Sequence, residues 1–200
     1  MPTIFCIGRN YAAHSREMGG SPERDAEMVV FTKPWQALLD APGPIVLPAG
    51  AVEVHHEAEL VVRVGPERLA DAVALGLDLT DRPRQAAAKK AGLPWTRAKG
   101  FRGSAPVGPF VPVAATPSLD ALRFTLAVDG QIRQRGDTSR MQRPVAEILA
   151  DLDRAFGLRS GDLVFTGTPE GVGPIAPGQR LVLEIDGVPS ATASFLVAAR

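Results

Sequence analysis

The 200-residue chain has little of three features that would mark whole classes of protein. A single cysteine, Cys6, cannot form an intrachain disulfide, which excludes a disulfide-stapled fold and favours a reducing compartment. The 22 Lys and Arg residues are balanced by 22 Asp and Glu residues, so no excess charge favours nucleic acid or an anionic membrane as a partner. No apolar run approaches the ~20 residues of a membrane span, and the first residues lack a signal peptide's basic flank. We therefore expect a cytoplasmic protein.

Turn-forming residues are abundant instead. The 20 glycines and 18 prolines exceed the usual share of about 12%, while 45% of the residues are hydrophobic, which suffices for a core. Many short elements with irregular connections are the expected result. At roughly 100–200 residues per domain, we expect one domain over residues 1–200.

Local patterns predict more strands than helices. Strands are predicted at residues 3–7, 28–32, 45–47, 52–64, 75–80 and 163–166. Helices are predicted at residues 11–18, 67–73, 84–91 and 144–156. Two hairpins, over residues 124–133 and 180–197, turn at Asp129-Gly130 and Asp186-Gly187. Strands and late hairpins together indicate a mixed α+β domain.

Two glutamates lie on one face of the predicted strand over residues 52–64. Glu57 and Glu59 are two residues apart, and side chains alternate along a strand, so both point the same way. Their carboxylates can converge on a hard cation such as Mg²⁺, which prefers oxygen ligands. Asp78, flanked by Leu77 and Leu79, is a candidate third ligand. The alternative is that the glutamates line a solvent-exposed face.

Three further side chains suggest chemistry. His14 and Glu17 are three apart and share a helix face, the spacing of a histidine base oriented by a carboxylate. Lys99 could stabilise an oxyanion near a metal. Each has an ordinary alternative, an incidental pair on a surface helix and a solvated lysine. His55 and His56 face opposite sides of a strand and are interpreted as structural.

Several motifs in one order resemble the fumarylacetoacetate hydrolase family. They are residues 8–14 (GRNYAAH), 31–34 (FTKP), 55–60 (HHEAEL), 77–80 (LDLT), 94–99 (PWTRAK) and 161–173 (GDLVFTGTPEGVG). The likeness extends from about residue 5 to residue 190. The sequence departs from the family pattern at Pro83, at Trp35-Gln36 and at Arg102-Gly103.

The resemblance implies a fold, a metal and a set of residue roles. The fold would be the family's mixed β-roll with short peripheral helices, usually as a homodimer. Three groups of residues would serve the site: Glu57, Glu59 and Asp78 binding Mg²⁺ or Mn²⁺; His14, Glu17 and Lys99 acting in catalysis; and Arg9, Arg82, Gln85 and Thr168 binding substrate.

The reaction implied is metal-dependent hydrolysis of a C–C bond in acylpyruvates, such as acetylpyruvate or fumarylpyruvate. His14, oriented by Glu17, would activate a water molecule, and the metal and Lys99 would hold the departing pyruvate enolate. One alternative is decarboxylation of oxaloacetate, or decarboxylation and isomerisation of 2-oxo-ene-dioates. Another is a binding protein whose catalytic site has decayed.

Overall fold

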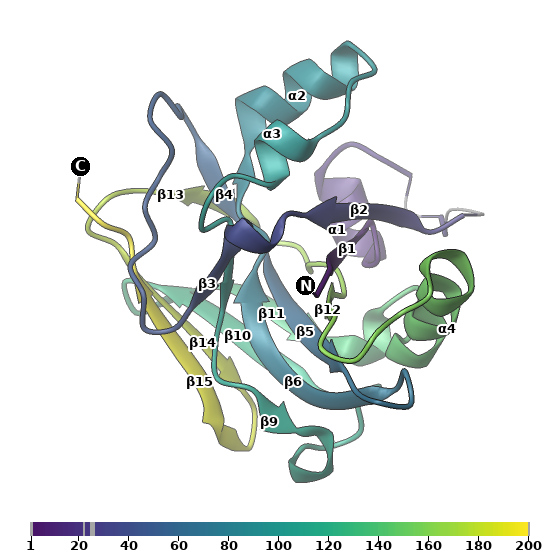
Figure 1. Ribbon diagram of the computed structural model, residues 1–200. Coiled ribbons are helices and arrows are strands. Elements are labelled where there is room, and N and C mark those ends of the chain that lie inside the picture. The colour runs from purple at the N-terminus through teal and green to yellow at the C-terminus, as the bar shows by residue number, and fades with distance from the viewer. Residues whose placement is uncertain (1, 22, 25–26, 200) are drawn as a thin grey trace.

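Strands dominate the structure, a computed structural model that describes residues 2–21, 23–24 and 27–199 (Figure 1). The largest sheet is mixed and strongly curved. Its strands, in spatial order, are β2 (Val29–Lys33), β1 (Ile4–Gly8), β12 (Leu163–Phe165), β5 (Ala58–Val64), β6 (Ala70–Leu77), β8 (Ala105–Val107) and β3 (Leu38–Asp40), with β9 (Val111–Pro112) beside β6. Only β1–β12 and β3–β8 pair in parallel in this sheet.

Two smaller antiparallel sheets complete the fold. One contains, in order, β11 (Gln131–Asp137), β10 (Arg123–Val128), β14 (Arg180–Ile185) and β15 (Val188–Leu196). The other contains β13 (Gly173–Ile175), β4 (Val54–His56) and β7 (Thr80–Asp81). Both predicted hairpins are confirmed, and Asp129 and Gly130 have the two positive φ angles, 51° and 78°, that a type I′ turn requires.

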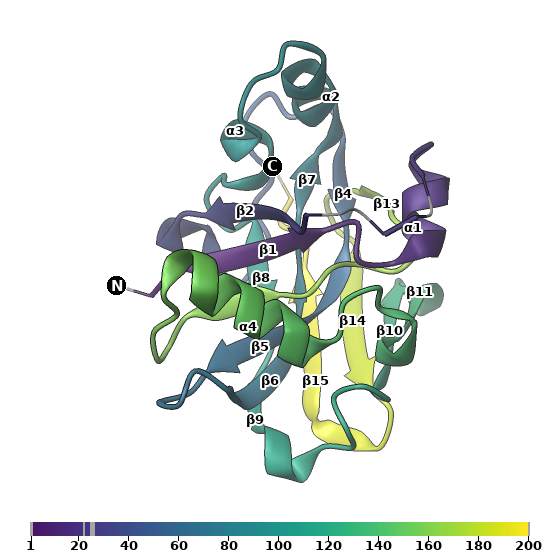
Figure 2. The same cartoon turned by 90° about the vertical axis from the view of Figure 1, so that its right-hand side faces the viewer.

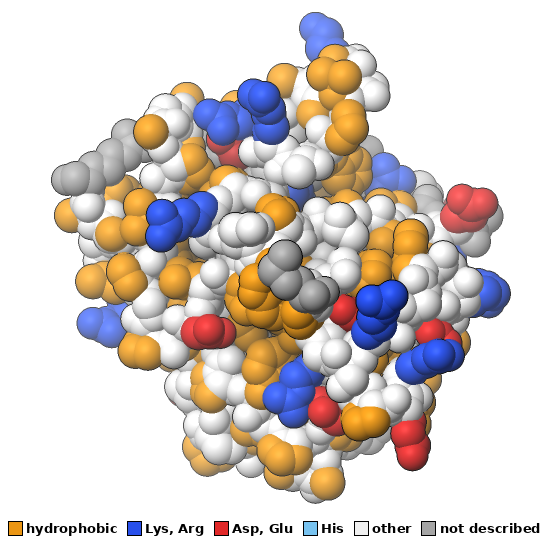
Figure 3. Space-filling model, viewed as in Figure 1, with side chains coloured by type: hydrophobic (Ala, Val, Ile, Leu, Met, Phe, Trp, Pro, Cys, Tyr) orange, Lys and Arg blue, Asp and Glu red, His pale blue; other side chains and the backbone are white. Residues whose placement is uncertain are grey.

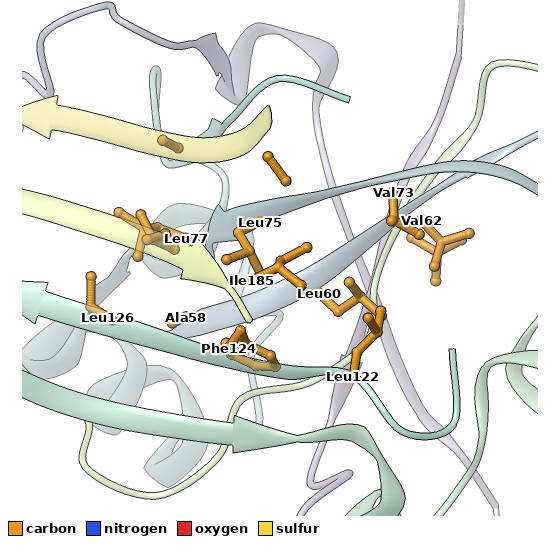
Figure 4. Close-up of a cluster of buried hydrophobic side chains, with 14 of the residues drawn as sticks. Ala58, Leu60, Val62, Val73, Leu75, Leu77, Leu122, Phe124, Leu126 and Ile185 are labelled. Carbon is orange, nitrogen blue, oxygen red and sulfur yellow. The ribbon is translucent and has the colours of Figure 1, made fainter. Parts of the chain in front are cut away.

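The main hydrophobic core lies between the curved sheet and the sheet of β10 and β14. Figure 4 shows side chains of β5 and β6, among them Leu60 and Leu75, meeting Phe124 and Ile185 from the opposite sheet. The other face of β5 is covered as well, because Val61 belongs to a second buried cluster with Phe165. The predicted alternation along this strand is confirmed, but neither face is exposed to solvent.

Helices are short and peripheral. They are α1 (Ala12–Glu17), α2 (Arg82–Lys90), α3 (Thr96–Lys99) and α4 (Val145–Phe156), with 3-10 turns at Trp35–Ala37, Val113–Ala115 and Thr138–Arg140. In both views α2 and α3 stand together at one end of the molecule, and α4 packs along the curved sheet (Figures 1 and 2). The four apolar residues of the predicted spacing in α4, Val145, Ile148, Leu149 and Leu152, are buried, and the left-handed Gly157 (φ 70°) ends the helix as predicted.

Two local predictions are wrong. Residues 67–73 form a turn followed by the start of β6, not a helix, because the segment connects two antiparallel neighbours in the sheet. Residues 45–47 form no strand, since only Ile45 makes an isolated bridge, to Val197. Both segments are shorter than the long periodic stretches on which pattern reading depends.

The surface agrees with the balanced composition. On the face in Figure 3, acidic and basic side chains are interspersed, with hydrophobic ones between them. None of the helices in the described residues is long and apolar enough to span a membrane. The α+β prediction is confirmed: one mixed sheet and two antiparallel sheets form a curled half-barrel with a few short helices around it.

Candidate active site

The pairing of β5 with β6 brings three carboxylates together. Ala58 pairs with Leu77, and the Asp78 N–H donates to the Glu57 carbonyl at 2.8 Å, so Asp78 lies opposite the start of β5. One carboxylate oxygen from each of Glu57, Glu59 and Asp78 lies within 4.8 Å of the others. The three residues are only 5%, 2% and 1% exposed. This burial rules out the alternative of a solvent-facing glutamate pair.

Cations surround two of these carboxylates. Lys99 Nζ lies 2.8 Å from Glu57 Oε2 and also contacts Asp78 Oδ2, while Arg82 Nη2 lies 2.6 Å from Glu57 Oε1. Burial alone would raise the pKa of Glu57, but Lys99 and Arg82 outweigh it and hold that pKa well below its usual value. Burial alone would lower the pKa of Lys99, but the negative charges of Asp78 and Glu57 outweigh this effect and raise that pKa above its usual value. Lys99 is therefore a fixed positive charge.

Glu59 is in a different environment. Its Oε2 accepts a hydrogen bond from the Gly167 N–H at 2.7 Å, and no lysine or arginine among the described residues forms an ion pair with it. Burial, then Asp78 and Glu57, raise the pKa of Glu59 well above its usual value. A divalent cation would relieve this crowding of negative charge, and buried carboxylate oxygens are the donors that Mg²⁺ and Mn²⁺ prefer. The three residues therefore fit such an ion.

A second buried lysine, Lys33, contacts the carboxylate cluster through Asp78. Lys33, at the end of β2, is fully buried, and its Nζ lies 2.7 Å from Asp78 Oδ1. The same ammonium donates to the carbonyls of Leu79 and Ser104 at 3.3 and 3.0 Å, and to that of Lys99. Lys33 thus ties Asp78 to the backbone that carries Lys99. In the sequence, Lys33 stands out only as part of the FTKP motif at residues 31–34.

The carboxylates open into a cavity of about 100 Å³. Nine of the ten residues selected from the sequence line it, since Glu17 alone is not part of its wall. His14 Nδ1 donates to Glu17 Oε2 at 3.2 Å, which leaves His14 Nε2 to exchange protons. Glu17 Oε1 accepts from the Gly171 N–H at 2.9 Å, so α1 is tied to the glycine-rich loop. The predicted pair exists in the structure and stands at the cavity.

The residues predicted to bind substrate all line the cavity, but their hydrogen bonds differ. Arg9, whose φ is 58°, and Gln85 both line the cavity, and Arg82 Nη1 donates to Gln85 Oε1 at 3.0 Å. Thr168 also lines the cavity, but its hydroxyl already donates to the Ala58 carbonyl at 2.9 Å. Thr168 therefore links the glycine-rich loop to β5 in this structure.

Gln134 is a structural residue that the sequence analysis missed. It is 1% exposed, and its Oε1 accepts from the Ala58 N–H and from His56 Nδ1, both at 2.9 Å. Its Nε2 donates to Thr168 Oγ1 at 2.8 Å and to the Pro169 carbonyl at 2.9 Å. One amide thus joins the carboxylate strand to the glycine-rich loop. Its neighbours on β11 are exposed, so no sequence pattern marks it.

His56 predicts a pH dependence of stability. Burial lowers its pKa in the folded protein, although the hydrogen bond to Gln134 opposes the shift. The unfolded chain therefore binds more protons than the folded one, and stability falls as pH drops below the unfolded value of about 6.5. We expect His56→Gln to flatten the dependence of the free energy of unfolding on pH between pH 8 and pH 5 in urea titrations. A variant that keeps the wild-type slope would contradict this assignment.

Comparison with known proteins agrees with this architecture. The α+β fold carries a buried carboxylate cluster and a histidine–glutamate pair at one small cavity, an arrangement typical of an enzyme. The family model "Fumarylacetoacetate (FAA) hydrolase C-terminal" matches residues 3–195. The chain belongs to this family, as its motifs suggested.

The relatives are enzymes with several names. The mitochondrial oxaloacetate tautomerase FAHD1 of Mus musculus is 44% identical over 94% of this chain and 88% of its own length. The mitochondrial oxaloacetate decarboxylase of Dictyostelium discoideum is 37% identical over 92% of this chain and 89% of its own. The crystal structure of fumarylpyruvate hydrolase from Pseudomonas aeruginosa, in complex with Mn²⁺ and pyruvate, is 38% identical, with a TM-score of 0.92, and covers 100% of this chain and 91% of that chain.

Proposed function

We propose that the protein is a Mg²⁺- or Mn²⁺-dependent enzyme that acts on short 2-oxo acids at the carbon next to the keto group. The observation that carries this proposal is the joint placement of three buried carboxylates, the His14–Glu17 pair and Lys99 at one cavity. The relative crystallised with Mn²⁺ and pyruvate supports both the ion and the class of ligand. Glu57, Glu59 and Asp78 would hold the ion, which when bound would polarise the keto group.

The chain's own residues then supply charge and proton transfer. Lys99 places a fixed positive charge beside the carboxylates, where it stabilises negative charge that develops on the substrate's 2-oxygen. His14 Nε2 exchanges a proton with carbon 3, while Glu17 holds the ring through Nδ1. Arg9, Arg82 and Gln85 would orient the substrate's polar groups from the cavity wall.

Proton transfer at carbon 3 is common to all candidate reactions. In oxaloacetate tautomerisation, the 2-hydroxyl of the enol loses a proton and carbon 3 gains one. In decarboxylation, carbon dioxide leaves carbon 3, which is then protonated. In acylpyruvate hydrolysis, water adds to the distal carbonyl, the bond to carbon 3 breaks, and the pyruvate enolate is protonated there. One base at one cavity can therefore serve tautomerisation and hydrolysis, while decarboxylation needs no base for the loss of carbon dioxide.

We favour oxaloacetate as substrate and keto–enol conversion as its main reaction, since 44% identity joins the chain to a tautomerase over nearly its whole length. Decarboxylation of oxaloacetate is supported by the Dictyostelium relative. Acylpyruvate hydrolysis is the second candidate, supported by the Pseudomonas structure and by a histidine that can activate water. A homodimer and a cytoplasmic location stay predictions from the sequence.

A side-by-side assay tests the proposal. Purified protein is given enol-oxaloacetate, keto-oxaloacetate and acetylpyruvate, each with Mg²⁺, with Mn²⁺ and with chelator, against protein-free blanks that correct for metal-catalysed decay. We expect turnover of oxaloacetate that chelator abolishes. Turnover of acetylpyruvate alone would make the protein a hydrolase. Turnover that is unaffected by chelator, or no turnover by folded protein, would contradict metal-dependent 2-oxo acid chemistry.

A further inference from the structure

One face of α2 forms part of the cavity wall. Arg82, Gln85 and Lys89 follow one another at spacings of three and four residues, which places them on one side of a helix. All three line the cavity. Lys89 lies seven residues beyond Arg82, about 10 Å along the helix axis. Because Arg82 contacts Glu57, the backbone of Lys89 lies about two helical turns beyond the α2 residue that meets the carboxylates.

Lys89 differs in its pairing from Arg82 and Lys99, which also line the cavity. Arg82 is paired with Glu57 and bonded to Gln85, and Lys99 is paired with Glu57 and Asp78. Within the described part of the chain, no carboxylate forms an ion pair with Lys89. Its ammonium lies 5.2 Å from the centre of the Trp95 ring, a contact that holds the charge at the cavity without neutralising it.

Positive charge accumulates around this position. Partial burial lowers the pKa of Lys89, and Arg82, Arg9 and Lys99 lower it further because each repels its charge, while Glu57 opposes the shift. A cluster of cations that repel one another is a favourable place for an anion. Arg82, two helical turns before Lys89, is the α2 residue that meets Glu57, so an anionic group at Lys89 lies away from that contact.

We propose that Lys89 is a specificity-determining residue that binds the distal carboxylate of a dicarboxylic 2-oxo acid. This inference rests on the proposed function, which places the 2-oxo acid end of the substrate at Glu57, Glu59 and Asp78. The distal carboxylate then extends toward α2 and meets the ammonium of Lys89 beside Trp95. A monocarboxylic acid of similar size leaves Lys89 without a partner and gains nothing from it.

Oxaloacetate and pyruvate form a matched pair for the test, since they differ only in the distal carboxylate. The dissociation constant of pyruvate is measured by calorimetry with Mn²⁺ present, and kcat and KM are measured for oxaloacetate. Lys89→Met is compared with Lys90→Met, which removes the same charge from the same helix outside the cavity. Lys89→Arg restores the charge. Circular dichroism and melting temperature establish that each variant is folded.

We expect Lys89→Met to raise KM for oxaloacetate about tenfold or more, as loss of a charged hydrogen bond implies, with kcat changed less than about threefold. Pyruvate binding should stay within about twofold, Lys90→Met should match wild type, and Lys89→Arg should recover most of the lost KM. Equal weakening of both acids, or no change in either, would overturn the assignment of Lys89. Wild-type protein that binds neither acid with Mn²⁺ would instead contradict the proposed function, and the inference with it.

Discussion

Replacing Glu59 with glutamine is expected to weaken divalent-metal binding strongly while leaving the metal-free protein at least as stable as wild type. Glutamine keeps the shape and can still accept the hydrogen bond from the Gly167 N–H. Burial and the neighbouring Asp78 and Glu57 raise the pKa of Glu59, which means that they disfavour its charged form. Glutamine carries no charge, so the repulsion within the cluster falls. We expect Mn²⁺ affinity to fall about a hundredfold or more, and turnover to fall about a thousandfold.

Two measurements separate these effects. Isothermal calorimetry gives the affinity for Mn²⁺, and thermal unfolding with and without Mn²⁺ gives the shift in melting temperature that the ion causes. Wild-type protein should show a large shift and Glu59→Gln almost none. Glu67→Gln, which removes an exposed carboxylate in the turn between β5 and β6, outside the cavity, is the matched control. Wild-type affinity in Glu59→Gln would remove Glu59 from the metal site.

Elements with strong local signals were predictable. The apolar spacing of residues 144–156 and the Gly157 stop correspond to α4, and the two Asp-Gly turns correspond to the β10–β11 and β14–β15 hairpins. These signals depend on neighbouring residues in the sequence, so they do not depend on how distant segments pack. Burial of both faces of β5 was not predictable, because it depends on sheets assembled from distant parts of the sequence.

In the candidate site too, features set by local sequence were predictable and features set by tertiary contacts were not. Spacing placed Glu57 and Glu59 together, but only the β5–β6 register brings Asp78 opposite them. Lys33 and Gln134 were missed because each acts through tertiary contacts, with Asp78 and with the glycine-rich loop. A lysine and a glutamine in otherwise ordinary strands carry no sequence signal of burial.

The departure from the family pattern at Pro83 has a local explanation. Pro83 lies in the first turn of α2, where a proline costs no backbone hydrogen bond. Asp81 caps the same helix by accepting from the Arg84 N–H at 3.2 Å. The turn therefore still directs Arg82 toward Glu57, and the substitution leaves this side of the cavity intact.

Replacing His14 with glutamine is expected to distinguish the candidate reactions. His14 is the histidine on the cavity wall, and Glu17 holds its ring. Glutamine keeps a polar group there but cannot take a proton, so tautomerisation and acylpyruvate hydrolysis should fall at least about a hundredfold. Oxaloacetate decarboxylation should be spared, because carbon dioxide leaves without a base and solvent can protonate carbon 3.

Glu17→Gln separates orientation of the ring from proton transfer. It should lower tautomerisation less than His14→Gln does, because the ring loses the carboxylate that orients it through Nδ1 but keeps its own nitrogen for proton transfer. His55→Gln, at a histidine outside the cavity, is the control for both variants. Wild-type hydrolysis or tautomerisation by His14→Gln would exclude His14 as the base. Equal loss of all three reactions would show instead that His14 acts on a step before carbon 3 reacts, such as binding of the substrate.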